Sequence, residues 1–350
     1  MCLITKEEKS MTIIEKILNT CLIALSLLLF ASCDSGSSSS SDQAPETSLK
    51  RGINIGNALE APKEGDWGVV IQESYFSTIK DGGFDFIRLP INWHSHSLQS
   101  SPYTIDESYF NRIDQMVGWA NKYGLAIIID VHHFDDMIYT PYGTLPRFKA
   151  IWKQIAERYA NQPYSVYFEI LNEPNANLTS DVWNDIYPQV LATIRESNQD
   201  RWVIIDGPFW SNWQTIQKLK LPDNDPRIIA SFHYYNPMEF THQGVDWDSN
   251  YNQYIGMTWT ETESQKQDVE DSFNHVANWA QENNVPILLG EFGTYYKAPM
   301  SSRVNWTQFV RQKAEEKNFS WAVWDFNAGF PIYNNSAQQW YTELLDALMK

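Results

Sequence analysis

The chain has 350 residues, of which 43% are hydrophobic and 14% aromatic, so it can bury a large core and is neither a disordered nor a fibrous protein. Its formal net charge of -17 argues against nucleic acid or another anionic polymer as a partner, because phosphate binding needs clustered lysine and arginine. An uncharged ligand fits this balance better.

The first 33 residues have the pattern of an export signal. The apolar run at 17–30 is too short and wrongly flanked for a membrane-spanning helix, but it suits the apolar region of a secretory signal. The sequence FASC, which ends at Cys33, resembles a bacterial lipobox, in which the cysteine is lipidated and becomes the mature N-terminus. We therefore predict a signal peptide over 1–33 and a lipid anchor at Cys33. Ordinary signal cleavage nearby is the alternative, and either Met1 or Met11 can be the start.

A serine-rich segment at 34–49 follows, which we interpret as a flexible tether. All three cysteines precede it, so the remaining chain, 50–350, has no disulfide and must rely on its core. No low-complexity gap divides this part, which predicts a single domain. We expect a monomer at the bacterial outer membrane or cell surface, or, without the lipid, in the periplasm or the medium.

From residue 51 onward, short β-rich runs alternate with amphipathic stretches. The predicted strands are 51–56, 84–91, 125–132, 165–172, 201–207, 227–235, 285–292 and 320–326. Helices are predicted over 106–124, 145–160 and 265–284, where apolar residues recur every three or four positions, and Gly124 suits a C-terminal cap.

Strands that alternate with helices pair in parallel, and runs that are apolar throughout, such as AIIIDV, indicate burial on both faces. Eight βα units in roughly 300 residues are typical of a closed (β/α)8 TIM barrel, an α/β fold. A doubly wound open sheet is the alternative, but no glycine-rich phosphate-binding loop follows the first strand.

Polar and aromatic residues recur at the ends of these strands, which is where a (β/α)8 barrel places its reactive groups. In chain order they are Asn54 and Asn57, Arg88, His132 and His133, Asn172 and Glu173, Trp210, His233 and Tyr235, Glu291, and Trp324. Any one of them can be a satisfied core group, but a structural protein has no reason to repeat this pattern along the whole barrel.

Glu173 and Glu291 stand at the ends of the fourth and seventh strands, so we expect them to face one another across the barrel mouth. Paired carboxylates that flank a cleft are the groups that cleave glycosidic bonds. Arg88 and Tyr235 favour an ionised Glu291, which suits a nucleophile, whereas Glu173 lies beside the neutral Asn172 and can act as acid and then base.

Other chemistries have weaker support. Successive strand residues point to opposite faces, so we do not expect His132 and His133 to chelate one ion, and we predict neither a catalytic metal nor another cofactor. No Gly-x-Ser-x-Gly sequence of a hydrolase triad occurs. The alternative from another class is a non-catalytic glycan-binding lipoprotein that keeps the barrel, although the two glutamates count against it.

The chain contains 15 tryptophans, whose flat rings are good platforms for the C–H faces of sugars. Those on predicted strand ends or loops are Trp93, Trp210, Trp213, Trp247, Trp259 and Trp324. Trp210 and Trp324 are the strongest candidates because of their strand-end positions.

The chain from about 51 to 348 resembles glycoside hydrolase family 5, of the retaining (β/α)8 clan A. The resemblance rests on RGINIGNALEAP, FIRLPINW, DVHHF, FEILNEP, FHYYNPMEFTHQG, LLGEFGTY and SWAVWDFNAGFPIYN. It implies Glu173 as acid/base and Glu291 as nucleophile. It also implies that Arg88, His132, His133, Asn172, His233, Tyr235 and Trp324 line the subsite at the cleaved bond, with Asn57 and Glu60 near the sugar.

The resemblance is closest to bacterial endo-β-1,4-glucanases, a subgroup that includes enzymes active on β-mannans. It implies a retaining endo-β-1,4-glycanase acting on a cellulose-type polysaccharide, with an endo-β-mannanase or a xyloglucanase as alternatives. Two cleft segments differ from the usual pattern. VWDFNAGFP, with Asp325 and Pro331, stands where relatives usually have YWEFCSGFG, and the loop FDDMIYTPYGTL is also unusual.

Overall fold

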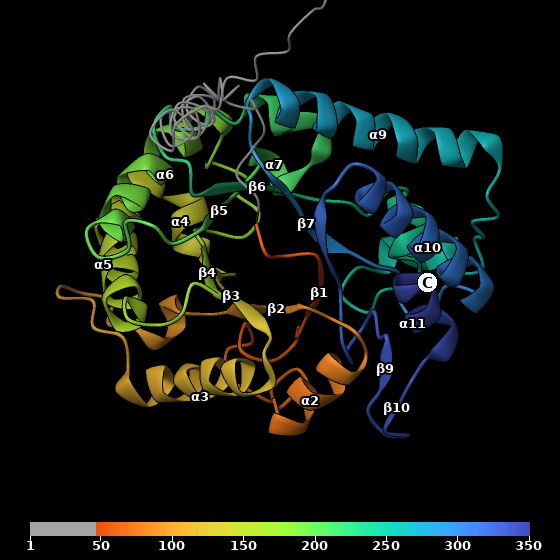
Figure 1. Cartoon of the computed structure of the whole chain (residues 1–350), viewed down its shortest axis with the longest axis horizontal. Helices are drawn as coiled ribbons and strands as arrows, with labels where there is room; N and C mark the ends of the chain where they lie inside the picture. The colour runs from red at the N-terminus through yellow and green to blue at the C-terminus, as the bar shows by residue number, and fades with distance from the viewer. Residues whose placement is uncertain (1–46) are drawn as a thin grey trace, which may run out of the picture. The chain divides into compact units, whose positions relative to one another are not determined.

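The computed structural model describes residues 47–350, so the predicted signal peptide, the lipidation site Cys33 and most of the predicted linker lie outside the described residues. Eight parallel strands form a closed barrel in chain order (Figure 1). Strand β8 pairs back onto β1. The strands are β1 (Arg51–Asn54), β2 (Phe86–Ile91), β3 (Ala126–Val131), β4 (Val166–Glu169), β5 (Val203–Asp206), β6 (Ile228–His233), β7 (Ile287–Phe292) and β8 (Ser320–Val323). The predicted (β/α)8 barrel is confirmed, and the open sheet is excluded.

Helices surround this barrel on the outside (Figure 1). They are α2 (Glu73–Asp81), α3 (Glu107–Tyr123), α4 (Asp135–Tyr139), α5 (Pro141–Tyr159), α6 (Ser180–Arg195), α7 (Pro208–Ser211), α8 (Met238–Thr241), α9 (Glu263–Glu282), α10 (Met300–Glu316) and α11 (Thr342–Met349). Short 3-10 helices cover His94–His96, Trp213–Lys218 (η2) and Ser249–Tyr254, and β9 (Tyr333–Asn334) and β10 (Gln339–Trp340) form a separate two-stranded sheet. In the described part of the chain, no helix is both long and apolar enough to cross a membrane.

Local sequence accounts for the helix ends. Gly124 has a φ of 64° and caps α3 in the left-handed conformation, as predicted. Thr262 and Gln265 form a reciprocal capping box at the start of α9. Helix α5 begins at Pro141, four residues before its predicted start, because proline is well suited to the first helical position.

The core has two main layers. The larger one lies between the strands and the helices, and a smaller one fills the barrel with side chains such as Phe86, Ile128 and Leu288. Leu49 is 3% exposed and belongs to the smaller layer, while Ser48 hydrogen-bonds Tyr167 at 2.6 Å. The predicted linker boundary at residue 49 is therefore too late, because Ser48 and Leu49 pack against the barrel.

Gly293 directly follows β7 and has no room for a side chain. A Cβ atom there would lie 1.9 Å from the backbone oxygen of Trp324, which cannot move without displacing the end of β8. We expect Gly293→Ala to reduce the free energy of unfolding by about 1–3 kcal/mol or more, measured by urea denaturation. The matched control is Gly118→Ala in α3, where nothing lies within 4 Å, and which should raise stability by about 0.5–1 kcal/mol. Equal effects of the two substitutions would contradict this interpretation.

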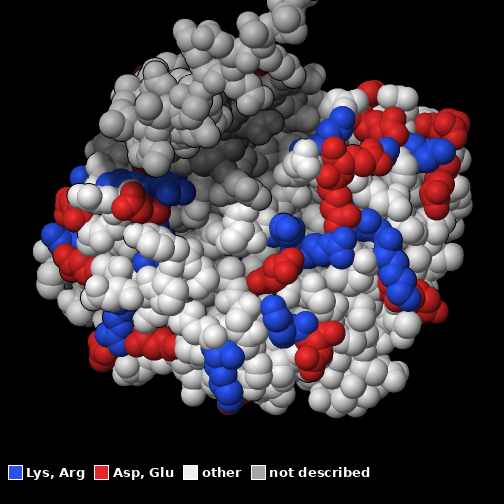
Figure 2. All heavy atoms as spheres, viewed as in Figure 1, with Lys and Arg blue, Asp and Glu red and all other residues white. Residues whose placement is uncertain are grey.

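Charged side chains of both signs are interspersed over the described part of the face in Figure 2. Several surface charges are paired, as when Arg158 contacts Glu107 at 2.8 Å and Asp114 at 2.6 Å. Such exposed pairs contribute little to stability, so the fold depends mainly on its apolar layers.

Candidate active site

An open groove of about 1340 Å³ lies at the C-terminal ends of the strands. Most of the predicted site residues line it: Asn57, Glu60, His132, His133, Glu173, Trp210, His233, Tyr235, Glu291 and Trp324. Arg88 and Asn172 do not. The barrel thus brings together residues that are scattered over the whole sequence.

The two glutamates approach each other closely in this groove. One carboxylate oxygen of Glu173, one of Glu291 and one ring nitrogen of His233 all lie within 4.8 Å of one another. Glu173 lies just beyond β4 and has a φ of 48°. Its side chain keeps 27% of its surface exposed, whereas the Glu291 side chain is 7% exposed. Both carboxyl groups can therefore reach one bound molecule.

Glu291 is surrounded by hydrogen-bond donors. Arg88 Nη1 donates to Oε1 at 2.8 Å, and the Tyr235 hydroxyl donates to Oε2 at 2.9 Å. Burial alone would raise the pKa of Glu291, but the charges of His233 and Arg88 and these hydrogen bonds hold it below its ordinary value. Glu291 is therefore ionised near neutral pH.

Glu173 has a different environment. His233 Nδ1 donates to Glu173 Oε1 at 2.7 Å. Desolvation raises the pKa of Glu173 above its ordinary value, although His233 opposes the shift, and the negative charge of Glu291 adds to it. The two carboxyl groups thus have pKa values shifted in opposite directions, which is the pattern of an acid paired with a nucleophile.

Arg88 lies beneath the groove, which corrects the prediction that it lines the sugar subsite. Its side chain is fully buried and contacts Glu169 through Nε at 2.8 Å and Nη2 at 2.6 Å. Nη2 also donates to Asn172 Oδ1 at 2.8 Å, so Asn172, at 6% exposure, is drawn below the groove as well. The reason is that β2 side chains at this level point into the barrel, where a guanidinium needs several acceptors.

Sequence reasoning missed the acidic side chains that compensate this charge. Asp130 Oδ2 lies 3.2 Å from Arg88 Nη2, and both Asp130 and Glu169 are fully buried. Each stands inside an otherwise apolar strand, and that contrast was an available signal, since buried carboxylates are rare unless they are paired.

His132 and His133 both line the groove, contrary to the prediction that they point to opposite faces. Strand β3 ends at Val131, so the alternation of side chains stops before the pair. His132 Nδ1 is 2.6 Å from Asp130 Oδ2, and its ring stacks on Trp324 with a centroid distance of 5.6 Å and an angle of 8°. Burial lowers the pKa of His132 well below its ordinary value, so the ring is neutral.

Among the described residues, Glu173, His233 and Glu291 form the group whose spacing could hold a cation. Their oxygens, however, already accept hydrogen bonds from His233, Tyr235 and the Arg88 guanidinium. A cation would have to displace these donors and approach a buried positive charge, so the chemistry of this donor set favours proton transfer over metal binding.

Exposed aromatic rings extend the groove on its solvent side. Trp210 is 55% exposed and Trp247 66%, and both line it. Trp67 and Tyr296 also line it, at 45% and 50% exposure, and were missed because they lie in loops without a strand-end signal. In contrast, two of the candidate platforms, Trp93 and Trp259, are buried at 0% and 1% exposure and serve packing.

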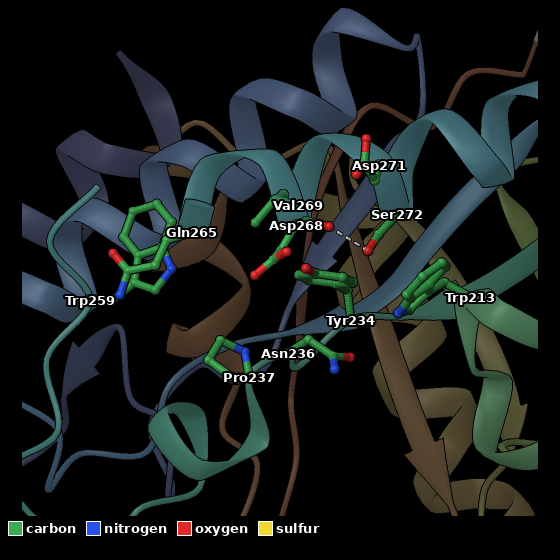
Figure 3. Close-up of a pocket in the computed structure, with 10 residues that line it drawn as sticks. All are labelled: Trp213, Tyr234, Asn236, Pro237, Trp259, Gln265, Asp268, Val269, Asp271 and Ser272. Atoms are coloured by element: carbon green, nitrogen blue, oxygen red, sulfur yellow. Dashed lines mark hydrogen bonds between the residues drawn. The ribbon is translucent and has the colours of Figure 1, made fainter. Parts of the chain in front are cut away.

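A second hollow of about 350 Å³ lies on the flank of the barrel, between α9 and the segment after β6 (Figure 3). Asn236 lines both hollows, and Trp213 lines only this one. Its acidic side chains, Asp268 and Asp271, are on α9, and Ser272 Oγ donates to the Asp268 backbone oxygen at 2.7 Å (Figure 3). Neither histidine nor arginine lines this hollow, so it lacks the groups that tune the pKa values in the groove.

Asp325 is buried behind the groove and holds the following loop, since its Oδ1 accepts from the Ala328 N–H at 2.8 Å. Burial raises the pKa of Asp325 from its ordinary 3.8 to about 7. The folded protein therefore binds this proton more tightly than the unfolded chain does. The contribution of protonated Asp325 to the free energy of unfolding is fully present below about pH 4 and is lost as the pH rises to about 7.

Asp325→Asn keeps an oxygen acceptor for Ala328 but cannot ionise. Between pH 5 and pH 8 we expect the free energy of unfolding of the wild type to fall by about 2–3 kcal/mol more than that of Asp325→Asn. Urea denaturation at the two pH values measures this difference. The exposed loop residue Asp223 supplies the control, Asp223→Asn, which should follow the wild type. Parallel behaviour of wild type and Asp325→Asn would rule out the expected ionisation.

A closed barrel with a tuned pair of carboxyl groups in an aromatic-lined groove defines a barrel of the glycoside-hydrolase class. The chain belongs to glycosyl hydrolase family 5: the model of the family described as Cellulase (glycosyl hydrolase family 5) matches residues 48–329. The resemblance stated from the sequence motifs is thereby confirmed.

The chain is similar to several endoglucanases. It is 39% identical over 304 residues to endoglucanase H of Acetivibrio thermocellus, covering 85% of this chain but only 32% of that protein. It is 27% identical over 340 residues to endoglucanase C of the same organism, covering 87% of this chain and 98% of that protein.

Solved structures agree with this relationship. The crystal structure of the endoglucanase Cel5A from the hyperthermophilic Thermotoga maritima has 42% sequence identity and a TM-score of 0.84, covering 86% of this chain and 97% of that one. Structures of the same enzyme with mannotriose and with cellobiose match equally well, at 41% and 42% identity.

Proposed function

We propose that this protein is a retaining endo-β-1,4-glycanase that hydrolyses internal linkages of a β-1,4-glucan. The observation that carries the proposal is the approach of the Glu173 and Glu291 oxygens to within 4.8 Å. Retaining glycosidases have carboxyl groups about 5–5.5 Å apart, whereas inverting ones need about 6.5–9.5 Å to admit a water molecule between acid and base. A direct attack on the sugar therefore fits better than an attack by water.

In the proposed mechanism, ionised Glu291 attacks the anomeric carbon while protonated Glu173 donates its proton to the leaving oxygen. This breaks the glycosidic bond and forms a glycosyl ester on Glu291. Glu173, now a carboxylate, removes a proton from water, which attacks the same carbon and releases Glu291. Arg88 and Tyr235 stabilise Glu291 as its charge returns, and no step requires a cofactor.

The substrate class is inferred from the shape and lining of the groove. It has a volume of about 1340 Å³ and is lined with exposed tryptophans, which suits a polymer of uncharged sugars. The relatives named above are endoglucanases, and one of them has been crystallised with both cellobiose and mannotriose. A β-mannan is therefore the second candidate substrate, and xyloglucan remains a third.

A panel of purified polysaccharides tests this proposal. We expect hydrolysis of carboxymethyl cellulose and mixed-linkage β-glucan, with a fall in viscosity that precedes most of the release of reducing ends, as endo cleavage requires. Proton NMR of the first products should show the β-anomer, which identifies retention. Faster hydrolysis of mannan or xyloglucan than of glucan would replace β-1,4-glucan as the proposed substrate. Binding of a polysaccharide without any release of reducing ends would reject the enzyme and favour the non-catalytic glycan-binding protein.

The proposal includes export and membrane attachment. The apolar run at 17–30 and the lipobox-like FASC sequence support a lipoprotein anchored through Cys33, acting on substrate as a monomer. Metabolic labelling with a fatty acid tests this: label on the wild type and none on Cys33→Ser is expected. Wild-type protein that carries no fatty-acid label and is found in the culture medium would favour ordinary secretion.

A further inference from the structure

Asp206 is a buried carboxylate directly behind Glu173. It ends β5, and its Oδ2 accepts from the backbone N–H of Glu173 at 3.0 Å and from Ser211 Oγ at 2.7 Å. The φ of 48° at Glu173 falls in the left-handed region, which is strained for a residue other than glycine. The hydrogen bond from its N–H to Asp206 holds this backbone and so fixes where the Glu173 side chain begins.

Asp206 also faces the ring of His233 from the side opposite Glu173. His233 Nδ1 is 2.7 Å from Glu173 Oε1, and Nε2 is 3.8 Å from Asp206 Oδ2. Within residues 47–350, both His233 Nε2 and Asp206 Oδ1 are buried without a hydrogen-bond partner. Such atoms are costly unless charge or a bound water compensates them, and a charged ring beside a carboxylate supplies that compensation.

The ring has little freedom to move away. A Cβ at Gly290 would lie 2.9 Å from His233 Nε2 and 2.9 Å from Ser231 Oγ, so the β7 backbone packs tightly against this edge of the imidazole. His233 is thus clamped between Glu173, Asp206 and Gly290, and a change at Asp206 reaches Glu173 through a fixed ring.

We propose that Asp206 is a positioning residue for Glu173, holding its backbone directly and keeping His233 charged as the donor to its carboxyl group. The inference rests on the proposed function, in which Glu173 is the acid/base. Asp206 does not line the groove, so it acts on the reaction only through its neighbours.

The charges around His233 give the direction of the expected effect. Burial lowers the pKa of His233, but Glu291, Glu173 and Asp206 together raise it to about 9. Without the Asp206 charge, the ring should lose its proton at a lower pH. The hydrogen bond and charge of His233 in turn lower the pKa of Glu173, so the Asp206 carboxylate reaches Glu173 through the charge of this ring.

The test is Asp206→Asn, which removes the charge but keeps an oxygen acceptor for the Glu173 N–H, made in the full-length protein. We expect NMR of nitrogen-labelled histidine to show the His233 midpoint lowered by about one pH unit or more. The value of kcat should fall about 10- to 100-fold with little change in KM, because Glu173 is misplaced while the groove is intact.

Two variants serve as controls. Asp130→Asn removes another fully buried carboxylate that contacts a histidine, His132, and should leave the His233 midpoint unmoved. Ser211→Ala removes one hydrogen bond to Asp206 but keeps its charge, so the His233 midpoint should stay near that of the wild type.

A wild-type His233 midpoint in folded Asp206→Asn would overturn the proposal, whatever the variant's rate. If that variant does not fold, the His233 titration of the wild type tests the proposal. An imidazole that is still mostly charged at pH 8 supports the inference, and one that is mostly neutral at pH 8 overturns it. Absence of glycan hydrolysis by the wild type would instead reject the proposed function, and it would leave the histidine titration interpretable.

Discussion

Glu291→Ala should abolish hydrolysis of soluble β-1,4-glucan, with kcat/KM reduced by about 10⁴-fold or more. The carboxylate supplies the nucleophilic oxygen that forms the covalent intermediate. No other side chain within the described groove is both ionised and hydrogen-bonded by Arg88 and Tyr235. Initial rates of reducing-end release measure the loss. The folded state of the variant should be checked first, because the Arg88 guanidinium loses one of its acceptors.

A small anion provides a sharper test of the role of Glu291. Azide can occupy the space left by the carboxylate in Glu291→Ala and attack the anomeric carbon itself, so partial recovery with a glycosyl azide of α configuration is expected from an aryl β-cellobioside. The matched control is Glu263→Gln on α9, whose side chain is 93% exposed and should behave as wild type. Near-wild-type hydrolysis by Glu291→Ala would reject the mechanism.

Glu173→Ala should reduce kcat/KM on β-glucan by about 10²- to 10⁴-fold, the usual contribution of a general acid. The loss should be much smaller for the first step with a dinitrophenyl β-cellobioside, whose leaving group needs no proton. Because deglycosylation still lacks its base, the glycosyl-enzyme should accumulate, and a burst of dinitrophenol should precede slow turnover.

The pH dependence gives a second readout for Glu173. Its raised pKa means that the protonated acid persists above the ordinary range of a glutamic acid, and deprotonation produces the basic limb of the wild-type kcat/KM profile. Glu173→Ala should lose this limb. An unchanged limb, or an equal loss on the natural and the activated substrate, would assign the acid to another group.

The eight strands were predictable because their signal is local. A run such as AIIIDV is apolar at every position, and an amphipathic stretch follows it, so the sequence alone indicates a strand buried on both faces and a covering helix. Strand ends were less well predicted. Strand β4 stops at Glu169, three residues before its predicted end, although the N–H groups of Ile170 and Asn172 still donate to Ile204 and Val131 on the neighbouring strands.

The candidate site was only partly accessible to the same reasoning. Glu173, Glu291 and most of the groove residues stand at strand ends, and the topology of a (β/α)8 barrel brings all strand ends together. Trp67 and Tyr296 lie in loops, where no periodicity places a side chain. The exposure of these rings depends on how distant segments pack.

The sequence by itself determined the order of strands and helices and the family, because propensities, apolar periodicity and short motifs act over a few neighbouring residues. It also predicted the two glutamates, whose roles stay a prediction. Only the tertiary structure decided that Arg88 lies under the groove, that His133 turns into it and that Asp206 stands behind Glu173. These contacts join residues far apart in the chain, as Arg88 and Glu291 are 203 positions apart. Closure of the barrel and the need of each buried charge for a partner bring them together.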